Sequence, residues 1–202
     1  MLKVLITGFE PFNKAKLNPS EQLVLRLDKH DVNGAEIITK VLPVVYSEAA
    51  RELLQLIDEH KPDAVICFGM AEGRKNISVE RFAVNLDDAA IADNSGEIRV
   101  NQKIHEAGPT AFESTLPIEK ILADLKKNDI PASQSLSAGA FVCNHIFYEL
   151  QNALVGMDVV SGFVHVPLMH EQQEDFPGLP TMDIHNMVNA ARSIVSSLVT
   201  SN

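Results

Sequence analysis

Hydrophobic residues along the chain follow two patterns that alternate from the N-terminus to the C-terminus. Short apolar runs that are typical of strands occupy about residues 2–7, 36–42, 63–68, 76–84, 131–135 and 158–166. Apolar residues at helical spacing predict helices over about residues 47–59, 116–127 and 181–198, and a further helix that begins near Cys143. Strands that alternate with helices predict one domain over residues 1–202, an α/β fold of three layers, α/β/α, around a mostly parallel, twisted central sheet.

Two long segments show neither pattern. Residues 85–115 are polar and rich in turn-forming residues, and a connection of this length is often a functional loop or lid. Residues 167–180 form a second long loop after the last predicted strand. We therefore expect the first segment to contribute to function.

Composition and charge narrow the class of protein. The 202 residues are 46% hydrophobic, enough for a sizeable core, and their formal net charge of −10 argues against nucleic acid or an anionic membrane as a partner. The apolar N-terminal run is too short for a secretory signal, and no stretch of about 18 apolar residues is found. Two cysteines without a Cys-x-x-Cys pair predict neither a disulfide framework nor a zinc site. We expect a cytoplasmic metabolic protein.

Cys143 has the sequence context of a nucleophile. Small residues and a glycine between Ser137 and Ala140 suit a tight turn, and the predicted helix follows. In the first turn of a helix, the dipole and the unpaired backbone N–H groups favour an anion and lower the pKa of a thiol. The same N–H groups can stabilise an oxyanion. However, Cys143 also shares a helical face with Ile146 and Leu150, as a buried structural cysteine would.

Glu80 and His165 are titratable residues within apolar strands. Glu80 either points to solvent from an edge strand or orients an imidazole. His165 lies near the carboxyl end of a buried strand, where open α/β sheets bind ligands, and is either a core histidine or a general base. His145 is interpreted as a helix residue, and Cys67, within an apolar strand, as a core thiol.

Aromatic residues follow the first strand at this same edge of the sheet. Phe9 and Phe12 either cap the core or line an apolar pocket. Asn18 suits a turn or the start of a helix. The segment Gly69–Lys75 fails both the Walker and the dinucleotide fingerprints, and it is interpreted as a strand-end turn whose backbone faces a ligand.

Several separated motifs together resemble those of the pyroglutamyl peptidases, cysteine enzymes that remove an N-terminal pyroglutamyl residue from peptides. The matching segments are Gly8–Phe12 with Asn18–Ser20, Ile77–Arg81 with Asn85, Ser137–Asn144, and Gly162–Pro167. The resemblance extends from Gly8 to Gln172. It implies that Cys143 is the nucleophile, that His165 is the base, and that Glu80 orients His165.

The resemblance also implies the binding site and the partners. Residues expected to bind the lactam ring are Phe9, Phe12, Asn18, Met70, Ile91 and Phe141. Asn18 is expected to hydrogen-bond the lactam. No cofactor and no metal are implied, and the expected partners are a peptide with N-terminal pyroglutamate and further copies of the chain, commonly in a homotetramer.

The chain departs from the family pattern at a few positions. Asn13 and Lys14 replace a glycine pair, and Ala140 replaces a threonine. Ala90 stands where the family usually has arginine, and Ala92 where it has proline. Because a cation is thereby lost near the expected site, the rate or the substrate range can differ. Two alternatives stay open: another cysteine-dependent amidase, and a non-catalytic α/β protein that binds small lactams or nucleosides.

Overall fold

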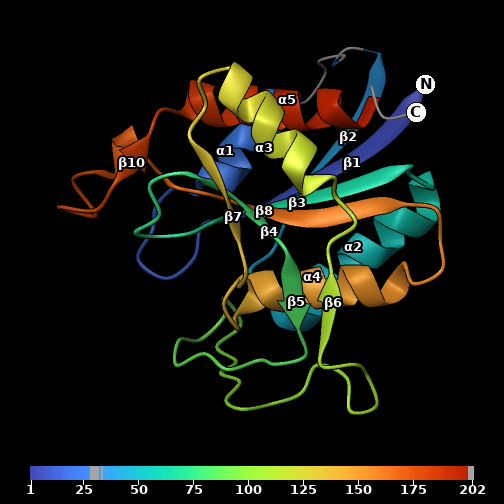
Figure 1. Cartoon of the computed structure of the whole chain (residues 1–202). Helices are drawn as coiled ribbons and strands as arrows, with labels where there is room; N and C mark the ends of the chain where they lie inside the picture. Colours follow the sequence, from blue (N-terminus) through green and yellow to red (C-terminus); the bar gives the residue numbers. More distant parts are fainter. Residues whose placement is uncertain (28–31, 33, 200–202) are drawn as a thin grey trace.

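A central mixed sheet organises the chain, as a computed structural model of residues 1–27, 32 and 34–199 shows (Figure 1). Within these residues six strands form the sheet, in the order β2-β1-β3-β8-β4-β7. Their bounds are β1 (Leu2–Phe9), β2 (Ala35–Leu42), β3 (Ala64–Met70), β4 (Ile77–Glu80), β7 (Ala132–Ser135) and β8 (Val160–Val166). All six coincide with predicted strands.

The direction of β4 positions the site. The strands β2, β1, β3 and β8 are parallel to one another, whereas β4 runs antiparallel to β8 and parallel to β7. In this register Ser78 is opposite His165, and Glu80 is opposite Phe163. Because directly opposite residues point to the same face of a sheet, Glu80 and His165 lie on one face.

Helices cover both faces of the sheet. The helices α1 (Pro19–Leu27), α3 (Ile118–Lys127) and α5 (Ile184–Val199) cover one face, and α2 (Tyr46–His60) and α4 (Val142–Ala153) cover the other (Figure 1). Along β3, Ile66 and Phe68 belong to the hydrophobic core under α1, α3 and α5, whereas Val65 and Cys67 belong to the core under α2 and α4. A strand buried on both faces must be apolar at every position, and β3 is. The predicted three-layer α/β fold is confirmed.

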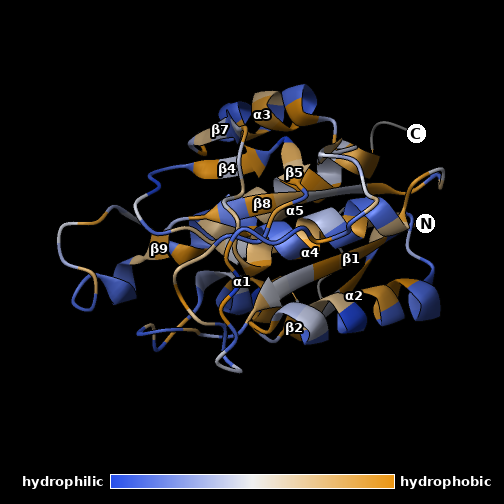
Figure 2. Cartoon of the chain, turned by 90° about the horizontal axis from the view of Figure 1, so that it is seen from below, coloured by the Kyte–Doolittle hydropathy of each residue, from blue (hydrophilic) through white to orange (hydrophobic). Residues whose placement is uncertain are grey.

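Hydropathy follows this layering. Figure 2 shows hydrophobic segments through the central strands, and hydrophobic and hydrophilic segments alternating along α2 and α3. The buried positions of α2 include Ala49 and Leu53, four residues apart, so that the helix presents one apolar stripe to the sheet. The inward face of α3 is formed by Ile118, Ile121 and Leu125.

Some elements differ from the prediction. The expected strand 76–84 divides at Arg81 into β4 and β5 (Phe82–Val84), and β5 pairs with β6 (Ala111–Glu113) inside the predicted long loop. The helix α1 was not predicted. The last helix begins at Ile184 rather than Thr181, because β9 (Leu168–Met169) pairs with β10 (Thr181–Met182), and a 3₁₀ turn, η1 (His170–Gln172), follows β9.

Candidate active site

Three elements bring Cys143, His165 and Glu80 to one region of the sheet. Cys143 is the second residue of α4 and so lies in the first helical turn, as the sequence predicted, and α4 packs on the face toward which Glu80 and His165 point. A Cβ atom at Gly69, opposite His165 on the neighbouring strand, would come within 2.9 Å of the Cys143 Sγ atom. The thiol therefore lies over β3, beside the strand that carries the imidazole.

Glu80 and His165 form a buried pair. The Nδ1 atom of His165 lies 2.7 Å from the Oε1 atom of Glu80, and the two side chains are 4% and 0% exposed. Burial lowers the pKa of His165, although the hydrogen bond from Nδ1–H to the carboxylate opposes this shift. With Nδ1 donating to Glu80, Nε2 is the imidazole nitrogen left to accept a proton.

Arg74 binds the same carboxylate oxygen of Glu80 as His165 does. One guanidinium nitrogen lies 2.7 Å from the same Oε1 atom of Glu80, and another donates to the carbonyl oxygen of Ser137 at 2.9 Å. The cation thus compensates a carboxylate that is fully buried, and it connects β4 to the turn that precedes Cys143. Nothing in the sequence pattern indicated this role, because Arg74 lies in a turn.

The pKa of Cys143 departs from the prediction. Part of the residue reaches solvent, but protein atoms surround the thiol on most sides, and this burial raises its pKa to about 12. The negative charge of Glu80 adds to the increase, and Arg74 opposes it. The sequence predicted a lowered pKa from the position at the start of a helix. That prediction was wrong, because desolvation exceeds the modest effect of the helix end.

A small apolar cavity lies beside the thiol. It is lined by Phe9, Phe12, Asn18, Val44, Met70, Phe141, Val142 and Cys143, and its volume is about 10 Å³. Five of the six predicted binding residues therefore share one cavity with Cys143. The sixth, Ile91, is 42% exposed and lies outside this lining. Val44 and Val142 were not predicted.

Asn18 holds the loop that forms one wall of the cavity. Its side-chain oxygen accepts hydrogen bonds from the backbone N–H and the hydroxyl of Ser20, and its amide donates to the carbonyl oxygen of Glu10 at 2.9 Å. These bonds begin α1 and fix the loop before it. One amide hydrogen of Asn18 is left for a further acceptor.

The turn before α4 leaves backbone donors available. Phe141, the N-cap residue, is extended and caps the helix with no side-chain hydrogen bond. The first N–H groups of a helix have no partner within it, so they are free to stabilise an oxyanion beside Cys143. Gly139 adopts a positive φ of 81°, a conformation that glycine adopts readily.

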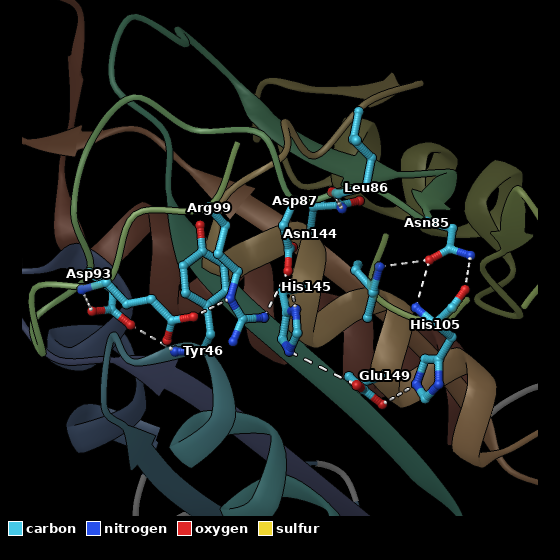
Figure 3. A network of polar contacts seen from close by, with 12 residues as sticks. Tyr46, Asn85, Leu86, Asp87, Asp93, Arg99, His105, Asn144, His145 and Glu149 are labelled. Carbon is cyan, nitrogen blue, oxygen red and sulfur yellow. Dashed lines mark hydrogen bonds and ion pairs between the residues drawn. The ribbon is translucent and has the colours of Figure 1, made fainter. Parts of the chain in front are cut away.

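A second network of polar side chains joins the long loop to α4. The Nδ1 atom of His145 lies 2.8 Å from the Oδ2 atom of Asp87, and an Arg99 nitrogen lies 2.9 Å from that oxygen (Figure 3). Arg99 also stacks on the ring of Tyr46, whose edge meets Phe141 in the cavity wall. The loop thus supports the wall. Sequence reasoning missed Asp87 and Arg99, and interpreted His145 only as a helix residue.

The side chain of Asn144 anchors the same loop from the residue after Cys143. It accepts a hydrogen bond from the N–H of Val84 and donates to the carbonyl oxygens of Val84 and Leu86, each at 2.9 Å. The N–H of Asp88 bonds the carbonyl oxygen of Ala140. In the ranges with assigned structure, no group of three or more His, Cys, Asp or Glu side chains is placed to hold a metal ion.

Comparison with known proteins shows the family to which the chain is similar. The family model for pyroglutamyl peptidase matches residues 2–200. The pyrrolidone-carboxylate peptidase of Bacillus licheniformis is 42% identical over 200 residues, which cover 97% of this chain and 93% of that protein. That of Erwinia tasmaniensis is 43% identical over 196 residues, covering 97% and 92%.

Solved structures give the same result. Pyroglutamyl peptidase I from Bacillus amyloliquefaciens superposes with a TM-score of 0.94 at 37% identity, covering 97% of this chain and 94% of that one. A mutant pyrrolidone carboxyl peptidase from Pyrococcus furiosus superposes with a TM-score of 0.95 at 39% identity, covering 99% of both chains. By sequence and by structure, the chain belongs to the pyroglutamyl peptidase family.

Proposed function

We propose that this chain hydrolyses the bond after an N-terminal pyroglutamyl residue of peptides, with Cys143 as nucleophile, His165 as base and Glu80 as the group that orients His165. The observation that carries the proposal is the 2.7 Å contact between Glu80 and His165 on the face where Cys143 and an apolar cavity meet. Nucleophile, base and orienting acid in this order are the requirements of acyl transfer through a covalent intermediate.

The high pKa of Cys143 determines how the reaction starts. A thiol with a pKa of about 12 is protonated at neutral pH, so His165 must remove its proton as the sulfur attacks. Because burial lowers the pKa of His165, its imidazole is neutral and able to accept that proton. His165 then protonates the leaving amine, and a water molecule, deprotonated by the same imidazole, hydrolyses the thioester.

The cavity favours an uncharged ring. Its lining is apolar apart from Asn18 and the thiol, so the charged amino group of a linear glutamyl residue would lose its hydration without gaining a partner. A lactam has no such charge, and its carbonyl can accept the amide hydrogen that Asn18 has available. The cavity of about 10 Å³ is too small for the ring, so binding requires movement of the half-buried rings of Phe12 and Phe141.

Release of a fluorophore from a pyroglutamyl amide tests the activity directly. The purified chain should cleave it, Cys143→Ser should lose at least a thousandfold in kcat, and Cys67→Ser, a core thiol 0% exposed, should retain the wild-type kcat. A glutamyl amide should be a much poorer substrate. Equal kcat/KM for both amides would support the alternative of a general cysteine amidase, and binding without turnover would support a non-catalytic protein.

We further propose that the chain assembles as a homotetramer, acts in the cytoplasm and needs no cofactor. Family resemblance supports the tetramer, and light scattering after size exclusion tests it. Each helix within residues 1–27, 32 and 34–199 is too short or too polar to cross a bilayer. Activity unchanged after dialysis against a chelator would agree with catalysis by side chains alone.

A further inference from the structure

Arg74 contacts two parts of the active site that are distant in the sequence. Its guanidinium bridges the Oε1 atom of Glu80, at 2.7 Å, and the carbonyl oxygen of Ser137, at 2.9 Å. The first contact is to the carboxylate oxygen that also meets His165, and the second is to the turn that ends at the N-terminus of α4. The Arg74 side chain is 28% exposed, whereas Glu80 is fully buried.

We propose that Arg74 is a positioning residue for the reaction: it compensates the charge of Glu80, so that His165 stays neutral, and it fixes the turn that presents Cys143. The inference rests on the proposed function, since it concerns the same three residues. It adds a fourth side chain, which acts through its contacts with Glu80 and Ser137.

The first part of the argument is electrostatic. A fully buried carboxylate needs a compensating charge, which either a guanidinium or an imidazolium can supply. With Arg74 in place the charge is already balanced, and His165 is free to act as a base. Without Arg74, a proton on His165 would become the remaining compensation, and the pKa of His165 would rise. An imidazolium cannot accept the proton of Cys143.

The charged groups around His165 and Cys143 predict that loss of Arg74 raises the pKa of both residues. The titratable or charged groups that act on His165 and Cys143 are Glu80 from β4, Arg74 from the turn after β3, and Cys67 from β3. Arg74 lowers the pKa of both His165 and Cys143, whereas Glu80 raises both. Loss of Arg74 therefore moves both pKa values upward, and proton transfer from thiol to imidazole needs a higher pH.

The second part of the argument is geometric. The other guanidinium nitrogen of Arg74 holds the carbonyl oxygen of Ser137, and the Ser137 hydroxyl accepts the N–H of Gly139 at 3.2 Å. This turn leads into the extended Phe141 and the free N–H groups beside Cys143. A lysine at position 74 would keep the charge, but its single ammonium lacks the planar fork that spans Glu80 and Ser137.

The test compares Arg74→Gln, Arg74→Lys and a matched control, Arg81→Gln. Arg81 also pairs with a glutamate, Glu113, at 2.8 Å, but that pair is exposed and lies outside the site. The pH dependence of kcat/KM for a pyroglutamyl amide is measured. Arg74→Gln should lose at least tenfold in kcat and shift the acid limb upward by about 1 pH unit. Arg81→Gln should match the wild type in both.

Arg74→Lys separates the two parts of the proposal. It should leave the acid limb at the wild-type pH while lowering kcat several-fold, and this variant carries the test if Arg74→Gln does not fold. A shifted acid limb in Arg74→Lys would overturn the electrostatic part. A double variant adds a further criterion: if Arg74 acts mainly through Glu80, Arg74→Gln should shift the acid limb less when Glu80→Gln is already present, because only the direct effect of the cation on His165 then remains.

Alkylation of Cys143 by iodoacetamide needs no turnover, and so distinguishes failure of this inference from failure of the proposed function. At a fixed pH, Arg74→Gln should slow alkylation about threefold, because a rise of about one unit in the pKa of Cys143 lowers the thiolate fraction about tenfold and the more basic thiolate recovers about threefold in reactivity. Arg81→Gln should not. A wild-type acid limb and a wild-type alkylation rate in Arg74→Gln would overturn the inference, as would equal shifts in Arg81→Gln.

Discussion

The pH dependence of Cys143 alkylation is the sharpest consequence of its burial. A thiol with a pKa of about 12 is about one part in 10⁴ thiolate at pH 8, whereas a free cysteine with a pKa of about 8.5 is roughly one quarter thiolate. The difference is about 2,000-fold in thiolate. A more basic thiolate is also a better nucleophile. With a Brønsted coefficient of about 0.45, the pKa difference of about 3.5 units makes the Cys143 thiolate about 40-fold more reactive than a free cysteine thiolate. Iodoacetamide should therefore react about 50-fold more slowly than with free cysteine.

The assay follows carbamidomethylation by peptide mass spectrometry between pH 7 and 10. The rate at Cys143 should rise about tenfold per pH unit over this whole range, without a plateau. Cys67 has a pKa raised to about 12 as well, but it is 0% exposed and should react more slowly still, because the reagent has no access. Saturating 2-pyrrolidone should protect Cys143 and leave Cys67 unaffected.

A plateau between pH 7 and 8.5 would refute this reasoning. It would mean that Cys143 and His165 exist as a thiolate and an imidazolium in the free enzyme, with the ion pair outweighing burial. His165 would then be the acid that protonates the leaving group from the start, rather than a base that first removes a proton. Labelling of Cys67 before Cys143 would contradict the assignment of the nucleophile itself.

Three further changes test other contacts. Gly69→Ala places a Cβ 2.9 Å from the Cys143 Sγ atom, and should cost about 1–3 kcal/mol in urea unfolding and reduce kcat; a wild-type kcat would contradict the close packing. Asp87→Asn removes the buried carboxylate that pairs with His145 and should destabilise the fold by about 3 kcal/mol. The acid limb of the pH profile of activity should not change, whereas a shifted limb would make His145 a candidate base. Burial lowers the pKa of His165, so near pH 6.5 the unfolded chain binds a proton at this histidine and the folded chain does not. The free energy of unfolding should therefore decrease as the pH falls below about 6.5. His165→Gln should make this decrease with pH smaller, as measured by urea unfolding.

The sequence predicts those parts of the fold in which one periodicity persists. The buried strand β3 and the amphipathic helix α2 lie within two residues of their predicted bounds, because burial on two faces or on one stripe leaves a clear pattern. The strands β9 and β10 have two residues each, too few for any period. The helix α1 is short, and its start depends on the side-chain bonds of Asn18, which only the folded chain forms.

The candidate site residues could be proposed from the sequence only where a motif contains them. Cys143, Glu80 and His165 were identified by resemblance, but their juxtaposition depends on the antiparallel direction of β4, which no local pattern specifies. Arg74 lies in a turn, where the direction of a side chain follows from tertiary contacts. The pKa of Cys143 was predicted in the wrong direction because a helix terminus is visible in a sequence, whereas the density of atoms around a thiol is not.

The central position of β8 has a consequence for how activity first arises. Among the six strands of the described sheet, β8 is the last along the chain, yet it lies between β3 and β4. Before its synthesis, the strands β2-β1-β3 and the pair β4-β7 have no strand to join them. The hydrogen bond between Glu80 and His165 spans 85 positions and can form only once β8 has paired with β4. A nascent chain that has not yet reached His165 thus lacks the proposed base, and on refolding turnover can return only after that strand has inserted.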